Sequence, residues 1–266
     1  MIRLVAVDLD DTLINSNLEI TAENLAAVDR VRRKGVQVTI ATGRMHVSAL
    51  PFARQLKLPQ NEIIISYNGA VLRRFNGELM AHIALQRQIA LDVIRYCQVR
   101  KWTLNIYHDD RLYVAELDDN VEYYMNMVGV QAHPVGDLYN FVVDQDLQLS
   151  KMLIIGSEEQ MESNLPVVQA EFGEKAQVTR SKKRYIEITH FDASKGKALA
   201  RLAASMGLDA QQVMAIGDSG NDLEMIKWAG LGVAVANASA DVKEAADFIT
   251  KSNDESGVAV ALNQLI

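Results

Sequence analysis

Short apolar runs alternate with helix-length segments at both ends of this chain, and this rhythm restricts its fold more than any other feature. Residues 3–7 and 36–41 have strand length, and a helical pattern that Thr21 can cap and Gly35 can close lies between them. Strands dominated by apolar residues are typical of parallel sheets, which helices cover on both faces. The sequence therefore predicts an α/β domain with a doubly wound parallel sheet.

The middle of the chain has a different rhythm. Hairpin-like pairs of short strands and several helices follow one another there, a mixture typical of an α+β unit. After Ser194 the first rhythm returns. We therefore expect one core domain, formed by residues 1–82 and 188–266, with an α+β cap domain inserted at residues 83–187. Within the insertion we expect helices near 85–100, 120–128 and 159–172, and strands near 103–107, 112–115, 151–156, 177–180 and 185–188.

Composition narrows the range of partners. The 266 residues include 27 Lys+Arg against 34 Asp+Glu, a net charge of −7, which argues against nucleic acid or an anionic membrane as partner. The one basic cluster, Arg30–Lys34, precedes Gly35 and is better explained by cations at a helix C-terminus. Cys97 is the single cysteine, and we find neither a signal peptide nor an apolar run of bilayer length. We expect a soluble, cytoplasmic protein, either a monomer or a homodimer.

Two acidic loops follow predicted strands. Asp8-Leu9-Asp10-Asp11-Thr12 comes after the first strand, and Gly217-Asp218-Ser219-Gly220-Asn221-Asp222 comes after the strand at 213–216. Doubly wound folds place their sites at the carboxyl ends of the strands. Clustered carboxylates repel one another unless a cation or hydrogen bonds hold them, and hard oxygen ligands suit Mg²⁺. Two such loops predict a magnesium site, although a solvated turn would also explain either loop alone.

Polar and cationic residues add an anion site. Thr42-Gly43-Arg44 follows the second strand and offers a hydroxyl and backbone N–H groups. Lys195 stands at the start of a helix, where the helix dipole does not favour a cation. A role in neutralising a phosphate therefore explains this lysine better than an idle position on the surface does. Asn68 follows a third predicted strand, at residues 62–66, and can line the same crevice, with a plain turn as the alternative.

These motifs, in this order, resemble those of the haloacid dehalogenase (HAD) superfamily of phosphotransferases. The whole chain resembles the Cof-type (subclass IIB) sugar-phosphate phosphatases of that superfamily. The resemblance is carried by an ordered set of motifs: Asp8-x-Asp10-x-Thr12, Thr42-Gly43-Arg44, Lys195-Gly196 and Gly217-Asp218-x-x-Asn221-Asp222. It implies a Rossmann-like core and a cap that selects the substrate.

The resemblance also implies roles for individual residues. Asp8 would be the nucleophile that forms an aspartyl-phosphate, and Asp10 the general acid and base, with its backbone carbonyl on the metal. Asp8 and Asp218 would bind Mg²⁺ directly, with Asp222 in support. The phosphoryl oxygens would be held by Leu9 through its N–H, Thr42, Gly43, Lys195 and Asn221, with Arg44 and Asn68 in support. Many relatives have glycine in place of Asp11, but aspartate tolerates the left-handed backbone well.

The expected activity is Mg²⁺-dependent hydrolysis of small phosphorylated metabolites, with sugar phosphates favoured. Pyridoxal phosphate or flavin-related phosphates are alternative substrates, and a phosphomutase would use the same carboxylates. A non-enzymatic phospho-receiver module would have no evident use for Asp10 or a cap. A dinucleotide-binding oxidoreductase fits poorly, because no G-x-G-x-x-G follows the first strand.

Overall fold

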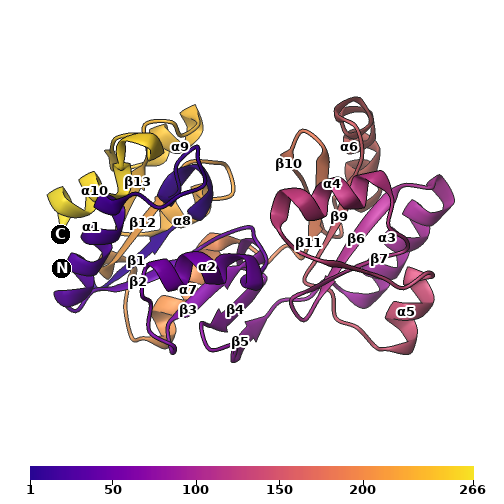
Figure 1. The fold of residues 1–266 in the computed structure, drawn as a ribbon, viewed down its shortest axis with the longest axis horizontal. Coiled ribbons are helices and arrows are strands. Elements are labelled where there is room, and N and C mark those ends of the chain that lie inside the picture. Colours follow the sequence, from indigo (N-terminus) through magenta and orange to yellow (C-terminus); the bar gives the residue numbers. More distant parts are fainter. The chain divides into compact units, whose positions relative to one another are not determined.

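The chain folds into two compact units. The computed structural model describes residues 1–266, apart from the side chain of Ser181. One unit joins Met1–Ala81 to Ala193–Ile266, and the other is His82–Asp192 (Figure 1). Strand β11 (Tyr185–Thr189) runs across the boundary expected at residue 187, so the second unit extends beyond it.

A parallel sheet forms the centre of the first unit, which we call the core unit. Its order is β14-β13-β12-β1-β2, and each pair is parallel. Its strands are β1 (Leu4–Val7), β2 (Gln37–Ile40), β12 (Val213–Gly217), β13 (Leu231–Ala234) and β14 (Phe248–Ile249). Its helices are α1 (Ala22–Arg33), α2 (His46–Gln55), α7 (Lys195–Ser205), α8 (Leu223–Trp228), α9 (Ala240–Ala245) and α10 (Gly257–Leu265). The predicted doubly wound sheet with helices on both faces is confirmed (Figure 1).

Strand β1 lies between a strand from the N-terminal part of the sequence, β2, and one from the C-terminal part, β12. Its four residues are all buried, and Val7 lies beside Ile40 of β2 on one side and Ile216 of β12 on the other. Because parallel strands end at the same edge, the loops after β1, β2 and β12 meet there. The sheet thus brings together the three motifs that follow these strands.

Helix α1 shows how local signals set the element boundaries. The hydroxyl of Thr21 accepts a hydrogen bond from the N–H of Asn24 (3.3 Å), and Gly35 adopts φ 84° beyond the last turn. The basic cluster occupies the last turn of α1, where Arg30 donates to the carbonyl of Leu262 (2.6 Å) in α10. These cations therefore lie at the C-terminal end of α1, as expected, and Arg30 also reaches the last turn of α10.

A small antiparallel sheet lies next to β2. It consists of β3 (Ile63–Ser66), β4 (Val71–Arg74) and β5 (Leu79–His82). A turn at Asn76-Gly77 separates β4 from β5. β3 runs parallel to the end of β2 through a bridge between Ala41 and Ile65, so its loop also reaches the edge where β1 and β2 end.

The second unit, which we call the cap unit, is α+β as predicted. Its sheet has the order β10-β11-β9-β6-β7-β8. Its strands are β6 (Thr103–His108), β7 (Arg111–Val114), β8 (Ala132–Pro134), β9 (Lys151–Ile155), β10 (Gln177–Lys182) and β11, and its helices are α3 (Arg87–Arg100), α4 (Asp119–Val128), α5 (Leu138–Asp144) and α6 (Glu158–Phe172). Sequence patterns missed α5 and β8, because seven and three residues are too few to show a period.

Each unit has its own hydrophobic core. In the cap unit, apolar residues of α3, α5 and α6 pack together with one face of the sheet. No helix in the described part of the chain combines the length and apolar character that crossing a bilayer requires.

Candidate active site

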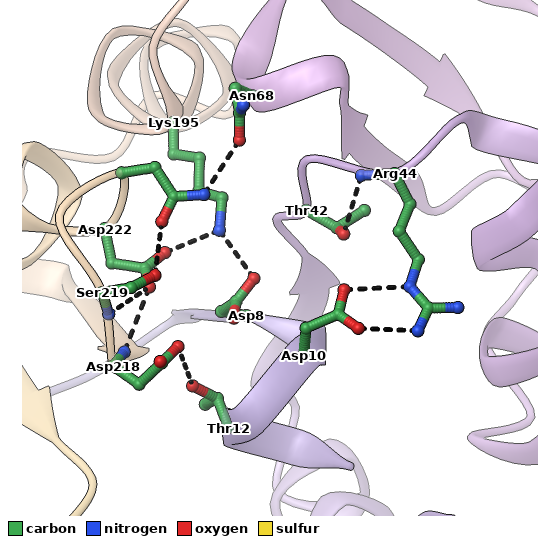
Figure 2. A network of polar contacts seen from close by, with 11 residues as sticks. Asp8, Asp10, Thr12, Thr42, Arg44, Asn68, Lys195, Asp218, Ser219 and Asp222 are labelled. Carbon is green, nitrogen blue, oxygen red and sulfur yellow. Dashed lines mark hydrogen bonds and ion pairs between the residues drawn. The ribbon is translucent and has the colours of Figure 1, made fainter. Parts of the chain in front are cut away.

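The loop after β1 is a single wide turn. The N–H of Leu13 donates to the carbonyl of Asp8 (3.2 Å), and the N–H of Ile14 donates to that of Leu9 (3.0 Å). Asp11 takes the left-handed conformation (φ 56°), as its replacement of glycine in many relatives led us to expect. Burial of Leu9 and Leu13 anchors the turn in the core. The turn thereby presents Asp8 and Asp10 at the edge of the sheet (Figure 2).

Three carboxylates converge at this edge. One oxygen from each of Asp8, Asp218 and Asp222 lies within 4.8 Å of the others. Asp8 and Asp222 are buried, and Asp218 is partly exposed. The expectation that Asp8 and Asp218 meet is fulfilled because β1 and β12 are adjacent strands.

Lys195 lies between two of these carboxylates. Its ammonium donates to Asp8 (2.6 Å) and to Asp222 (2.7 Å), and the side chain is only 1% exposed. Burial alone would lower the pKa of Lys195, but the charges of Asp222 and Asp8 raise it overall. Lys195 therefore remains a cation. Its place at the first position of α7, unfavourable for the helix dipole, is compensated by these two ion pairs.

One ammonium does not neutralise three carboxylates. Burial, followed by the charge of Asp222, raises the pKa of Asp8 well above its usual range despite Lys195. The same two causes, in the same order, raise the pKa of Asp218 to about 6. Burial is the larger cause of both pKa shifts, and the excess of negative charge on these hard oxygen atoms adds to it. This donor set fits a divalent cation such as Mg²⁺, which prefers oxygen ligands and few carboxylates.

Asp222 shapes the loop that contains Asp218. Its second oxygen accepts hydrogen bonds from the N–H groups of Asp218 and Ser219, each at 3.1 Å. A Cβ on Gly217 would lie 2.5 Å from the carboxyl carbon of Asp222, so only glycine lets the loop fold back this closely. Thr12, to which the sequence assigned no role, donates to Asp218 (3.1 Å) and so connects the two acidic loops.

The side chain of Asp10 faces away from the three clustered carboxylates. Arg44 donates to its two oxygens from Nε (2.9 Å) and Nη2 (2.6 Å), in the paired geometry typical of strong arginine–carboxylate contacts. Among the described residues, the cluster with metal-ligand spacing contains Asp222 and lacks the carboxylate of Asp10. The expected metal contact of Asp10 concerned its backbone carbonyl, which remains a prediction.

The predicted phosphate-binding residues come from the loops after β1, β2 and β12 and from the start of α7. The hydroxyl of Thr42 accepts from the N–H of Arg44 (3.1 Å). A Cβ on Gly43 would lie 2.8 Å from Oδ1 of Asn68, and that same oxygen accepts from Nδ2 of Asn221 (3.0 Å). Asn68, left-handed at φ 55°, thus bridges the loops after β2 and β12 (Figure 2).

Residues 5–262 match the model of the haloacid dehalogenase-like hydrolase family, and the chain belongs to that family. It is 32% identical to YxeH of Bacillus subtilis (strain 168) over 100% of this chain and 99% of that protein. It is 30% identical to the 5-amino-6-(5-phospho-D-ribitylamino)uracil phosphatase YwtE of the same strain, over 99% of this chain and 98% of the relative. The crystal structure of TM0651 from Thermotoga maritima superposes with a TM-score of 0.91 at 30% identity, covering 100% of this chain and 98% of the other.

These findings confirm the resemblance inferred from the four motifs, the fold class and the enzyme class. The chain is a hydrolase of the HAD family, of the phosphatase type. The individual roles of Asp8, Asp10, Lys195 and the other site residues remain predictions.

Proposed function

We propose that this chain is a cytoplasmic, Mg²⁺-dependent phosphatase that hydrolyses small phosphorylated metabolites, sugar phosphates first among them, through an aspartyl-phosphate on Asp8. The observation that carries this proposal is the convergence of Asp8, Asp218 and Asp222 around one buried lysine at the end of β1. Such a site combines a nucleophile with a place for a divalent cation, which phosphoryl transfer requires.

Asp8 and Asp218 would hold the metal, with support from Asp222 and the carbonyl of Asp10. When bound, Mg²⁺ neutralises charge on the carboxylates and on the phosphoryl group. Lys195 adds a second positive charge beside Asp8. Thr42, the N–H groups of Leu9 and Gly43, and Asn221 would orient the phosphoryl oxygens.

The reaction takes place in two steps. A carboxylate oxygen of Asp8 forms a bond to phosphorus while the bond from phosphorus to the alcohol oxygen breaks, and the alcohol receives a proton from Asp10. Water then attacks the aspartyl-phosphate, Asp10 takes one proton from that water, and Asp8 and inorganic phosphate are released. Covalent capture divides one difficult displacement into two easier ones. The ion pair with Arg44 must open for Asp10 to exchange these protons.

Flavin-related phosphates are the second candidate substrates. One specific observation favours them: YwtE, 30% identical over nearly the whole chain, is named for a phosphorylated ribitylaminouracil. Its substrate carries the phosphate on a polyol chain, which is chemically close to a sugar phosphate. A phosphomutase remains an alternative use of the same carboxylates, and a requirement for glucose bisphosphate would identify it.

The test is release of inorganic phosphate by the purified protein. The panel contains sugar phosphates, a ribitylaminouracil phosphate, pyridoxal phosphate and nucleotides, each with Mg²⁺ and with EDTA. We expect hydrolysis with Mg²⁺ and none with EDTA. Asp8→Asn, which keeps the size of the side chain, is expected to abolish turnover without unfolding the protein. Substantial activity in this variant would remove Asp8 from the role of nucleophile.

A further inference from the structure

Three asparagine side chains from other parts of the core unit bind the loop that carries Asp8 and Asp10. Each donates its amide N–H to a backbone carbonyl within or just after the wide turn. The pairs are Asn237 to Asp11 (2.7 Å), Asn24 to Leu13 (3.1 Å) and Asn253 to Ile14 (3.2 Å). These contacts join the catalytic loop to residues that the four family motifs do not include.

Two of these amides are themselves held by the C-terminal segment. Oδ1 of Asn237 accepts from the N–H of Asn253 (3.0 Å), and Oδ1 of Asn24 accepts from the N–H of Ala259 (2.8 Å). Each amide therefore bridges a loop carbonyl to residues 253–259. Asn24 and Asn253 are buried, whereas Asn237 is exposed. The same segment continues the connection through Asp254, whose carboxylate accepts from the N–H and the hydroxyl of Ser16, each at 2.8 Å.

The shape of the turn explains the need for outside donors. Its internal hydrogen bonds use the carbonyls of Asp8 and Leu9, while the left-handed Asp11 directs the chain away from a regular helix. A buried carbonyl without a donor costs about 1–3 kcal/mol, so Asn24 and Asn253 stabilise this form of the loop at the buried residues Leu13 and Ile14. Asp11 is exposed, so Asn237 fixes the direction of its carbonyl rather than relieving a burial penalty. The donor atoms of the asparagines therefore select this conformation of the loop.

We propose that Asn24, Asn237 and Asn253 are positioning residues for Asp10. Asp10 directly precedes Asp11, the residue held by Asn237, so release of that carbonyl frees the backbone that aims the Asp10 carboxylate. The part of this proposal that concerns proton transfer rests on the proposed phosphatase function. The part that concerns the rigidity of the loop does not.

Asn237→Asp is the most selective variant. It keeps the oxygen that accepts from the N–H of Asn253, and it replaces the donor to the carbonyl of Asp11 by a second oxygen, which repels that carbonyl. Because Asn237 is exposed, the fold is expected to tolerate the change. Asn17→Asp is the matched control, since it adds the same charge at an exposed position of the hairpin that follows the turn.

Two substrates separate positioning of Asp10 from general damage. The leaving group of an alkyl phosphate such as glycerol phosphate needs a proton, whereas nitrophenolate leaves p-nitrophenyl phosphate as a stable anion. We expect Asn237→Asp to lower kcat/KM for the alkyl phosphate about tenfold more than for p-nitrophenyl phosphate, with the unfolding temperature unchanged. We expect Asn17→Asp to leave the ratio of the two values as in the wild type.

Amide hydrogen exchange of residues 9–14, followed by mass spectrometry, gives a second reading that needs no activity. We expect faster exchange in Asn237→Asp than in Asn17→Asp or the wild type. Unchanged exchange would overturn the proposal, as would an equal loss of kcat/KM on the two substrates. A wild-type protein that releases phosphate from none of the substrates, including those of the metabolite panel, would instead refute the proposed function, and the exchange result would still decide whether the asparagines hold the loop.

Discussion

The excess of negative charge at the site predicts that Mg²⁺ stabilises the protein in a pH-dependent way. Burial and the charge of Asp222 raise the pKa of Asp218 to about 6, from an ordinary value of 3.8. Between these two values the folded protein keeps a proton that the unfolded chain releases. The contribution of Asp218 to the free energy of unfolding of the metal-free protein therefore falls as pH rises through this window, and this contribution levels off above pH 6.

The magnitude follows from the two pKa values. Each tenfold change in proton affinity corresponds to about 1.4 kcal/mol, so the difference between 3.8 and about 6 amounts to about 3 kcal/mol before solvent screening of this partly exposed carboxylate. Mg²⁺ binds the ionised carboxylates and competes with the proton below pH 6. At a metal concentration one hundred times Kd, binding adds about 2.7 kcal/mol, or roughly 5–10 °C in Tm for a chain of this size.

The assay is thermal unfolding with EDTA or with Mg²⁺, at pH 5 and pH 7.5. The difference between the two conditions at one pH isolates the metal site, because groups elsewhere titrate equally in both. We expect a gain in Tm at pH 7.5 and a much smaller gain at pH 5. Asp218→Asn is expected to lose most of the gain at pH 7.5. An equal gain at both pH values, or a full gain in Asp218→Asn, would refute the reasoning.

Three further changes test the site and the core. Thr12→Val removes the hydrogen bond to Asp218 with little change of shape; we expect a loss of about 1 kcal/mol in Mg²⁺ binding, measured as the Mg²⁺ dependence of phosphate release. Gly217→Ala places a Cβ 2.5 Å from the carboxyl carbon of Asp222; we expect about 1–3 kcal/mol lower stability by urea unfolding, together with a loss of activity. Burial raises the pKa of Glu62 to about 7, from an ordinary 4.5, so its contribution to stability falls as pH rises through that window. Glu62→Gln is therefore expected to raise the free energy of unfolding at pH 8 by up to about 3 kcal/mol and to change it little at pH 4, and an equal effect at the two pH values would contradict this.

The meeting of Asp8 with Asp218 could be predicted from the sequence for a physical reason. Both residues follow short apolar strands, and parallel strands end at one edge of their sheet. The order of the motifs along the chain then indicated which loops contribute to one site. The left-handed backbone of Asp11 was predictable only through the resemblance, because many relatives have glycine at this position and aspartate tolerates the same conformation.

Long-range polar contacts could not be predicted in this way. Arg44 was assigned only a supporting role, and nothing in Thr42-Gly43-Arg44 indicates that its guanidinium pairs with Asp10. Asn237 and Asn253 lie in segments without period or motif, and their amides reach carbonyls far away in the sequence. A carbonyl belongs to every residue, so the sequence carries no signal for which one an amide will bind.

The connectivity of the core explains how an insertion of this size leaves the site intact. All residues with a proposed chemical role lie in the core unit, in the segments before β5 or from Lys195 onward. The sheet closes across this interruption, because β1 pairs directly with β12 and each residue from Leu4 to Val7 has a partner there. The ion pairs of Lys195 and the hydrogen bond from Thr12 to Asp218 are likewise made without any residue of the cap unit. Substitutions in residues 82–192 therefore leave each of these contacts in place, so that a change of substrate through the insertion need not alter the groups that act on phosphate.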